Sequence, residues 1–249
     1  MKNRQQILSQ RGDLSPFLIH LTRDGVFRSD PTQTARVTLS AKTSLENILQ
    51  QLKIQAKSAL GYFNYKVSWN GRNPYSQIQR HWLYACCFTE TPLKDVSIQF
   101  QSIEGRRCHF KPYGLAFFEE TVKGRGGNPV LYVDTRNQGM RTAFDQMALA
   151  PNCIDFKGIM PFVEGFGAPW FGYLPSEIDF RWEREWRCAN DFDFQLREVA
   201  FGICPANEIA YFEGLTSNQV PFVDVSNPSA LASAKVKLGG MSRFNGVRF

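Results

Sequence analysis

The chain has 249 residues and a formal net charge of +6 at pH 7, from 29 basic and 23 acidic side chains. This length can bury a sizeable core and no long linker divides it, so we expect a single domain over residues 1–225 and a basic tail over 226–249. Six cysteines without a CxxC pair and three scattered histidines argue against a disulfide scaffold and a metal site, so we expect reduced thiols and no metal.

Both ends of the chain carry a local excess of positive charge. Basic residues without any acid occur before residue 12 and after Asp224, namely Lys2, Arg4, Arg11, Lys235, Lys237, Arg243 and Arg248. Solvated termini are the simpler explanation, and contact with a nucleic acid or a nucleotide phosphate is the functional alternative. No stretch has the length of a signal-peptide core or a membrane span, so we expect a cytoplasmic protein without membrane contact.

Short predicted strands and helices alternate along the chain without a regular period. Apolar runs predict strands over 17–22, 81–89, 113–118, 129–134 and 199–204. Helices are predicted from the capping-box pattern of Thr43–Glu46, after the Thr91–Pro92 signal, over a brief stretch that Gly124 ends, over 138–150 and from Asn207 onward.

Two segments without a clear period are predicted to be loops. Residues 61–80 are rich in Gly, Asn, Tyr and Arg and should form an exposed loop. The aromatic, glycine-rich segment 157–175 should form a long loop packed over the core as a lid. The irregular order of the elements indicates an α+β fold with mixed or antiparallel, split β-sheets and short helices.

Residues 178–188 show an alternation that predicts one strand with two different faces. One face would hold Phe180, Trp182, Trp186 and Cys188, with both tryptophans buried, and the other Arg181, Glu183, Glu185 and Arg187. A solvated face whose opposite charges support one another is one explanation. The other is a Glu-x-Glu active-site strand, in which one carboxylate holds a substrate hydroxyl and the other orients an acceptor. In either case a solvent-lined Glu185 should contribute little to stability.

Two further strands end in polar residues that a purely structural strand does not need. His20 closes the first apolar run, although a strand histidine is most often a satisfied core or surface residue. Thr89-Glu90-Thr91 closes the second run, and a helix cap accounts for Thr91 but not for Thr89.

A histidine on a first strand, a hydroxyl-x-hydroxyl motif on a second and Glu-x-Glu on a third resemble the NAD site of ADP-ribosyltransferases. The resemblance implies that His20 contacts a ribose of NAD, that Thr89 and Thr91 support the pocket, and that Glu185 is the catalytic residue. Glu183 would face the acceptor. His20, Thr89 and Glu185 must then converge on one cleft between two small sheets.

The residues after His20 extend this assignment. Thr22 and Arg23 are expected to take part in NAD binding, since a planar guanidinium suits bidentate contact with phosphate. The His20-to-Thr22 stretch also resembles the DNA-modifying DarT branch, although the "Gly-Leu" turn of that branch is absent here.

A resemblance to the bacterial abortive-phage-infection family called AbiGi covers residues 16 to 205. The resemblance lies in six blocks, which are Pro16-Phe-Leu-Ile-His-Leu-Thr-Arg23, Cys87-Phe-Thr-Glu-Thr-Pro-Leu93, Phe110-Lys-Pro-Tyr-Gly-Leu115, Gly127-Asn-Pro-Val130, Pro161-Phe-Val-Glu-Gly-Phe-Gly167 and Trp182-Glu-Arg-Glu-Trp-Arg187. The resemblance implies phage defence together with a partner protein of the same operon, and a nucleic acid or protein as the acceptor of ADP-ribose. A non-catalytic antitoxin or nucleic-acid-binding subunit is the alternative, and a nuclease ranks lowest because no carboxylate cluster suggests a metal site.

Overall fold

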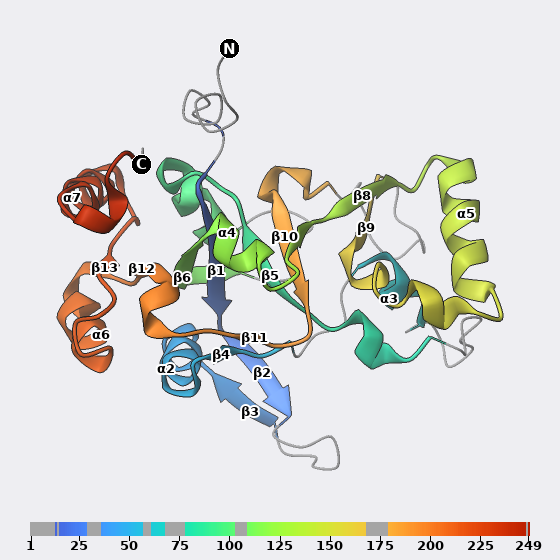
Figure 1. Ribbon diagram of the computed structural model, residues 1–249, viewed down its shortest axis with the longest axis horizontal. Coiled ribbons are helices and arrows are strands. Elements are labelled where there is room, and N and C mark those ends of the chain that lie inside the picture. The colour runs from blue at the N-terminus through green and yellow to red at the C-terminus, as the bar shows by residue number, and fades with distance from the viewer. Residues whose placement is uncertain are drawn as a thin grey trace. The chain divides into compact units, whose positions relative to one another are not determined.

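The computed structural model describes residue 13 and residues 15–28, 36–56, 61–67, 78–102, 109–167, 179–247 and 249. The chain forms two compact units, and each is assembled from segments that are far apart in the sequence (Figure 1). Unit 1 contains residues 1–53, 89–121 and 193–249, and unit 2 contains residues 54–88 and 122–192. Strands and short helices occur in both units, which confirms the predicted α+β class.

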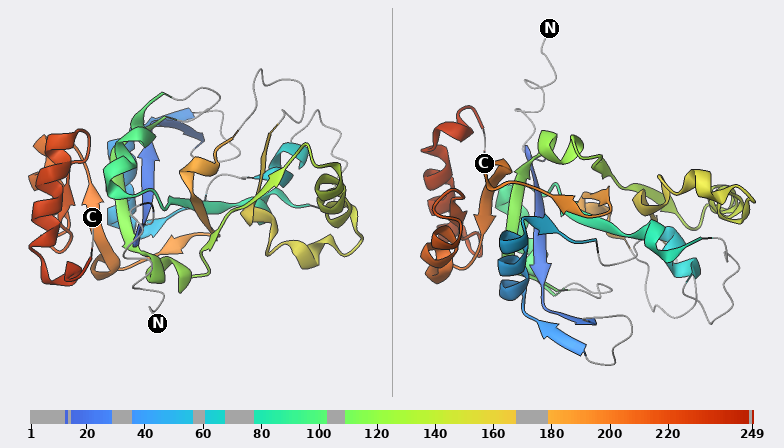
Figure 2. Two further views of the ribbon diagram at one scale, coloured as in Figure 1. Left: turned by 90° about the horizontal axis from the view of Figure 1, so that it is seen from above. Right: turned by 60° about the horizontal axis from the view of Figure 1, so that its bottom comes forward.

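Four strands of unit 1 follow one another in the order β13, β12, β6, β1. The long strands β1 (Phe17–Arg23) and β6 (Phe110–Phe118) run antiparallel and lie side by side in Figures 1 and 2. β12 (Val199–Ile203) is antiparallel to β6 and pairs in parallel with β13 (Phe222–Val223). The sheet is therefore mixed, and β1, β6 and β12 contain the apolar runs that predict strands in the sequence.

Strand β1 is buried on both faces, since Leu18 is also fully buried, and one face belongs to a core cluster of unit 1. Phe17, Ile19 and Leu21 are buried there, as the two-residue period of a strand requires. The ring of Phe17 packs edge-on against that of Phe201, with centroids 5.0 Å apart, and also contacts the ring of Phe244.

Helix α2 (Ala41–Gln51) begins earlier than its sequence signal predicts. Ser40 is the N-cap, because its hydroxyl accepts a hydrogen bond from the backbone nitrogen of Thr43 at 3.0 Å. The predicted capping box from Thr43 to Glu46 is therefore wrong, since Thr43 already lies inside the helix. The apolar stripe is confirmed, because Leu45 and Leu49 are buried.

The basic C-terminal segment is part of the core of unit 1. It contains α7 (Pro228–Gly239), capped by Asn227, and it buries Leu238 and Phe244. Lys237 binds the Glu213 carboxylate at 2.6 Å and the Phe222 carbonyl at 2.9 Å. Arg243 donates to the carbonyls of Val199 and Ala200 at 3.2 Å. Two of the cations that were expected to be solvated, or in the alternative to meet an anionic partner, therefore bind groups of the protein.

The other elements of unit 1 connect these strands and helices. They are the hairpin β2 (Gly25–Arg28) and β3 (Arg36–Leu39), helix α6 (Ile209–Leu215), and the 3-10 turns η2 (Leu93–Phe100), η6 (Leu196–Glu198), η7 (Ala206–Glu208) and η8 (Ser242–Phe244). Figure 2 shows α6 and α7 together at the β13 end of this sheet. Four short elements lie where the described chain passes from one unit to the other, namely β4 (Lys53–Ile54), β5 (Ala85–Thr89), α4 (Glu119–Lys123) and β11 (Phe192–Asp193).

Unit 2 contains two small groups of strands. In the first, β10 (Glu185–Ala189) lies between β5 (Ala85–Thr89) and β7 (Asn128–Pro129) and is antiparallel to β7. In the second, β8 (Leu131–Asp134) and β9 (Val163–Phe166) run parallel. The remaining elements are α3 (Tyr62–Val67), α5 (Gln138–Leu149), η1 (Arg80–Leu83), η3 (Cys153–Phe156), η4 (Met160–Phe162) and η5 (Arg181–Glu183).

Both predicted loops contain regular structure where they are described. Residues 62–67 form α3 and bury Tyr62 and Phe63, so an exposed loop is wrong there, and residues 68–77 lie outside the described part. The expected lid contains η4 and β9, and its residues 168–175 also lie outside the described part. The core of unit 2 gathers around these elements, with Val133, Met160 and Val163 buried beside α3.

Replacing Gly202 by Ala should destabilise the protein by about 1–3 kcal/mol, because a β-carbon at this position would collide with the buried ring of Phe222. Gly214→Ala is the matched control, since nothing lies within 4 Å of its β-carbon and α6 should gain about 0.5–1 kcal/mol from the better helix former. Urea denaturation of both variants measures the difference. Equal midpoints for the two variants would contradict the packing described for β12 and β13.

Candidate functional site

The segment expected as one alternating strand is divided at Arg184. Residues 181–183 form the turn η5, and Arg184 adopts a left-handed conformation with φ of 48°. A left-handed residue ends the turn, because its backbone cannot continue a helix or a strand. Strand β10 therefore begins only at Glu185, and the prediction that Glu183 and Glu185 share one strand face is wrong.

The burial of β10 does not alternate either. Trp186, Arg187 and Cys188 are all buried, so the strand is covered on both faces. A solvated charged face is wrong for Arg187, whose side chain is only 2% exposed. A guanidinium buried to this extent needs close partners, because an unpaired buried charge is very costly.

The partners of Arg187 are two carboxylates and one backbone carbonyl. Its Nε and Nη2 donate to the two carboxylate oxygens of Glu185, each at 2.9 Å. Nη2 also donates to Glu164 at 2.6 Å, and Nη1 donates to the Pro161 carbonyl at 2.8 Å. The fork of the guanidinium is matched to Glu185 on one side and to β9 and η4 on the other.

We call Arg187, Glu185 and Glu164 the arginine–glutamate triad. When both carboxylates are ionised, its net charge is −1. The side chains of Glu164 and Glu185 are 17% and 16% exposed, whereas that of Arg187 is 2% exposed. The triad therefore presents surplus negative charge from a buried cationic base.

The charges of the triad affect one another and their neighbours. Burial raises the pKa of Glu164, and this outweighs the lowering effect of Arg187. Burial alone would lower the pKa of Arg187, but Glu185 and Glu164 raise it well above its ordinary value. Burial and the charge of Glu185 also raise the pKa values of Cys87 and Tyr132, so both groups stay protonated beside the triad at neutral pH.

The backbone of Gly61 lies directly against the triad. Its φ is +84°, and a β-carbon there would collide with the Val163 carbonyl and approach Nη1 of Arg187. Glycine is required here both for the positive φ and for this close approach. The start of α3 thus covers one side of the buried guanidinium.

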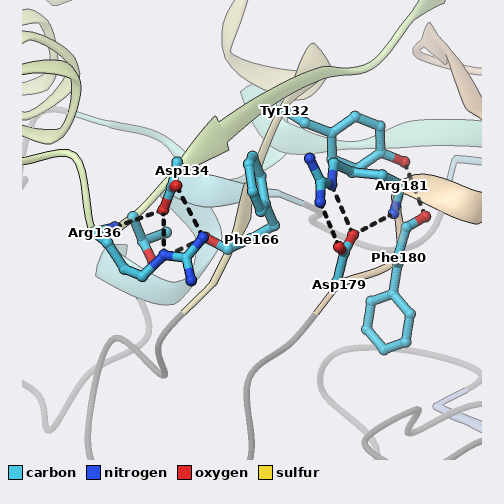
Figure 3. A network of polar contacts seen from close by, with 8 residues as sticks. Tyr132, Asp134, Arg136, Phe166, Asp179, Phe180 and Arg181 are labelled. Atoms are coloured by element: carbon cyan, nitrogen blue, oxygen red, sulfur yellow. Dashed lines mark hydrogen bonds and ion pairs between the residues drawn. The ribbon is translucent and has the colours of Figure 1, made fainter.

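A second polar network lies at the ends of β8 and β9 (Figure 3). Arg136 binds Asp134 through Nε and Nη2, each at 3.0 Å, and Arg181 binds Asp179 at 2.9 and 2.6 Å. Figure 3 shows the ring of Phe166 between the two pairs, and the guanidinium of Arg181 lies 4.0 Å from its centroid. Both arginine side chains are about half exposed, at 51% and 52%.

The first-strand residues expected to bind NAD lie on β1 of unit 1. His20 is partly buried and pairs with Leu115 of β6. The hydroxyl of Thr22 is buried and lies 2.8 Å from the Ala41 carbonyl and 3.2 Å from that of Tyr113, so it links β1 to α2 and β6. Arg23 is exposed and follows a register irregularity between Leu21 and itself.

The two threonines of the hydroxyl motif contact each other. Their hydroxyl oxygens are 2.6 Å apart, the Thr91 nitrogen donates to the Thr89 hydroxyl at 3.1 Å, and Gln99 donates to Thr91 at 3.2 Å. The turn η2 begins at Leu93 without a side-chain cap, so the predicted cap by Thr91 is wrong. Its hydroxyl is engaged within this buried polar group instead.

Some of the expected site residues are brought together within unit 1. Thr89 pairs directly with Ile19, the neighbour of His20 on β1. Glu183 and Glu185 belong to unit 2. Convergence of His20, Thr89 and Glu185 on one cleft stays a prediction.

Glu164 is the residue that the sequence patterns missed. It is the only acid in the apolar and glycine-rich stretch 157–167, just as Arg187 is the only charge between the apolar Trp186 and Cys188. A lone acid and a lone base in two buried segments are a signal for an ion pair, because neither charge can be buried alone.

Comparison of the chain with protein-family models, with curated proteins and with solved structures returns no match. Within the described ranges, no group of three or more His, Cys, Asp or Glu side chains could hold a metal ion. Over the same ranges, no helix is both long enough and apolar enough to cross a membrane. All of the described cysteines are free thiols.

The two tryptophans of the charged segment should differ in their effect on stability. Trp186 is 6% exposed and Trp182 is 39% exposed, so the expectation that both are buried is wrong for Trp182. Trp186→Ala should cost about 3–5 kcal/mol of unfolding free energy through lost packing. Trp182→Ala should cost about 1 kcal/mol or less. Chemical denaturation of both variants tests the order, and similar losses would contradict the division of the segment at Arg184.

Removing Arg187 should destabilise the protein far more than removing Arg181. Each arginine binds one carboxylate through two nitrogens, but only Arg187 is buried. Arg187→Ala should cost about 3–5 kcal/mol because it leaves buried carboxylates unpaired. Arg181→Ala should change the unfolding free energy very little because its ion pair is exposed. Denaturation midpoints measure both, and a comparable loss for the two variants would show that burial does not decide the contribution.

Proposed function

We propose that the protein is an ADP-ribosyltransferase-like enzyme of phage defence that uses NAD as its substrate and needs no metal. The observation that supports this best is the geometry of Glu185. Its side chain is 16% exposed, while two hydrogen bonds from the buried Arg187 fix the orientation of its carboxylate. A carboxylate that is held before substrate arrives can act without reorganisation during the reaction.

In the proposed reaction, the bond between C1′ of the nicotinamide ribose and the pyridine nitrogen breaks. The bonding electron pair leaves with nicotinamide, which departs as a neutral molecule, and the ribose becomes positively charged. Glu185 accepts a hydrogen bond from the ribose 2′-hydroxyl and stabilises this charge. A nucleophile on the acceptor then bonds to C1′ and loses its proton, or water does so when NAD is hydrolysed.

The charge of the triad is suited to this reaction. With both carboxylates ionised, one buried cation is outnumbered by two partly exposed anions. The surplus negative charge favours a ligand in which positive charge develops, and in a poorly solvated site such an interaction is stronger than in water.

The remaining assignments complete the proposal. In the proposed fold, an ADP-ribosyltransferase-like pair of split sheets forms the NAD cleft. His20 contacts a ribose, Thr22 and Arg23 lie on the phosphate side, and Thr89 and Thr91 support the pocket. Thr22, Thr89 and Thr91 would support it through their backbone positions, since their hydroxyls already have protein partners. Glu183 faces the acceptor, which is a nucleic acid or a protein.

A non-catalytic binding subunit is the second candidate, and the surface of unit 2 favours it. Arg136 and Arg181 are half exposed near the ring of Phe166, and the exposed Trp182 follows Arg181 in the chain. Arginines interspersed with aromatic side chains are typical of surfaces that bind single-stranded nucleic acid or a protein partner. In this case the triad would serve stability alone.

Glu185→Gln should lower the rate of nicotinamide release from NAD by about 10²- to 10³-fold, because the amide cannot stabilise the positive ribose. Asp179→Asn is the matched control, since it makes the same chemical change in another bidentate arginine pair and should leave the rate unchanged. Both variants are assayed with labelled NAD well below their melting temperatures, because Glu185→Gln also weakens the contact that holds Arg187.

Two outcomes would reject the enzyme proposal. The first is a wild-type protein that releases no nicotinamide with or without phage components. The second is a folded Glu185→Gln protein that turns over NAD, or protects cells from phage, as well as the wild type does. Either result would favour the second candidate, in which the protein is a non-catalytic binding subunit.

A further inference from the structure

We propose that Glu164 is a positioning residue for Glu185, and that it sets the charge of the site through the nitrogen of Arg187 that both carboxylates share. This inference rests on the proposed function for its role in catalysis. The Glu-x-Glu pattern instead predicts that Glu183 and Glu185 act together. The left-handed backbone of Arg184 places them on different elements, Glu183 in η5 and Glu185 in β10. The second carboxylate beside Glu185 is therefore Glu164, which comes from β9.

The geometry of the shared nitrogen carries the argument. Nη2 of Arg187 lies 2.6 Å from Oε2 of Glu164 and 2.9 Å from Oε2 of Glu185. The two carboxylates thus contact one guanidinium edge and are close neighbours. Because like charges at such a separation disfavour each other, the ionisation of one glutamate must change the electrostatic environment of the other.

The two protonation states of Glu164 give the site two different charges. With Glu164 protonated, Arg187 and an ionised Glu185 form a neutral pair, and the guanidinium compensates the Glu185 charge in full. With Glu164 ionised, one guanidinium serves two carboxylates, and the triad carries a net charge of −1 on two partly exposed side chains. The second state is the one that stabilises a positive ribose.

The pH range of this change follows from the surroundings of Glu164. Burial raises its pKa, so Glu164 loses its proton at a higher pH than an ordinary glutamate. The other groups that face it are Arg187 and Glu185 on β10, together with Tyr132, its register partner on β8. Cys87 and Tyr132 have raised pKa values and remain neutral in this range, and the nearby Tyr62 of α3 donates its hydroxyl to Asp145.

The test is a pH titration of the full-length protein labelled with ¹³C at the glutamate side-chain carboxyl carbons. The Glu164 and Glu185 signals are assigned by their loss in Glu164→Gln and Glu185→Gln. In the wild type, the Glu185 signal should shift at the pH where the Glu164 signal titrates, and in Glu164→Gln this shift should be lost. A wild-type Glu185 signal that does not move at the Glu164 midpoint overturns the inference, even if the variant fails to fold.

Nicotinamide release over the same pH range connects the titration to catalysis. The wild-type rate should rise with pH through the Glu164 midpoint, and Glu164→Gln should lose this limb and stay at the low plateau. Glu164→Asp, which keeps the charge, should restore the limb in part. A purely structural Glu164 would change the melting temperature without changing the shape of the pH profile, and that result overturns the positioning role.

The two proposals fail in different ways. No release of nicotinamide by a wild-type protein whose Glu185 signal shifts at the Glu164 midpoint would reject the enzyme proposal and keep the charge coupling. Nicotinamide release with a pH profile that Glu164→Gln leaves unchanged would keep the enzyme and reject Glu164 as its positioning residue.

Discussion

The arrangement of unit 2 depends on the need to pair one buried guanidinium. Arg187 lies on a strand that is covered on both faces, so water cannot solvate its charge. The partners come from its own strand through Glu185, from β9 through Glu164 and from η4 through the Pro161 carbonyl. Gly61 supplies the remaining cover, because only a residue without a side chain fits against the guanidinium there. One ion thus lies against three stretches that are distant in the sequence, around Gly61, over residues 161–164 and over residues 185–187.

The same pairing also determines the charge of the candidate site. Burying two carboxylates with one guanidinium leaves the triad with a net charge of −1 when both are ionised, and both glutamate side chains are partly exposed. An oxocarbenium-like ribose complements such a charge better than a neutral ligand does. The polar residues of unit 1 contribute differently, because the hydroxyls of Thr22, Thr89 and Thr91 are bound within the fold. The charged groups on which the proposed reaction depends therefore lie on β9 and β10.

The sequence predicted what local patterns control. The apolar run of β1, the leucine stripe of α2 and the helix α5 occur where their periodicity indicates, since each depends on neighbours along the chain. The prediction of one strand over 178–188 is wrong because the left-handed Arg184 divides the segment. The alternation of residue types cannot reveal a single backbone angle. Glu164 was missed for another reason. Its partner lies on a different strand, and a long-range ion pair leaves no periodic trace in either segment.

Unit 1 is built from segments that are far apart in the sequence, and this constrains the order in which it can fold. Phe17, near the start of the described chain, packs against Phe244 and Phe249 near its end. During synthesis a ribosome releases the first of these rings long before the other two, and the whole of unit 2 emerges in between. The core around β1 therefore stays incomplete until the last segment emerges, although Leu93, Val96 and Ala116 can contact it earlier. A nascent chain of this protein would be most exposed to chaperones and to aggregation through its earliest strand.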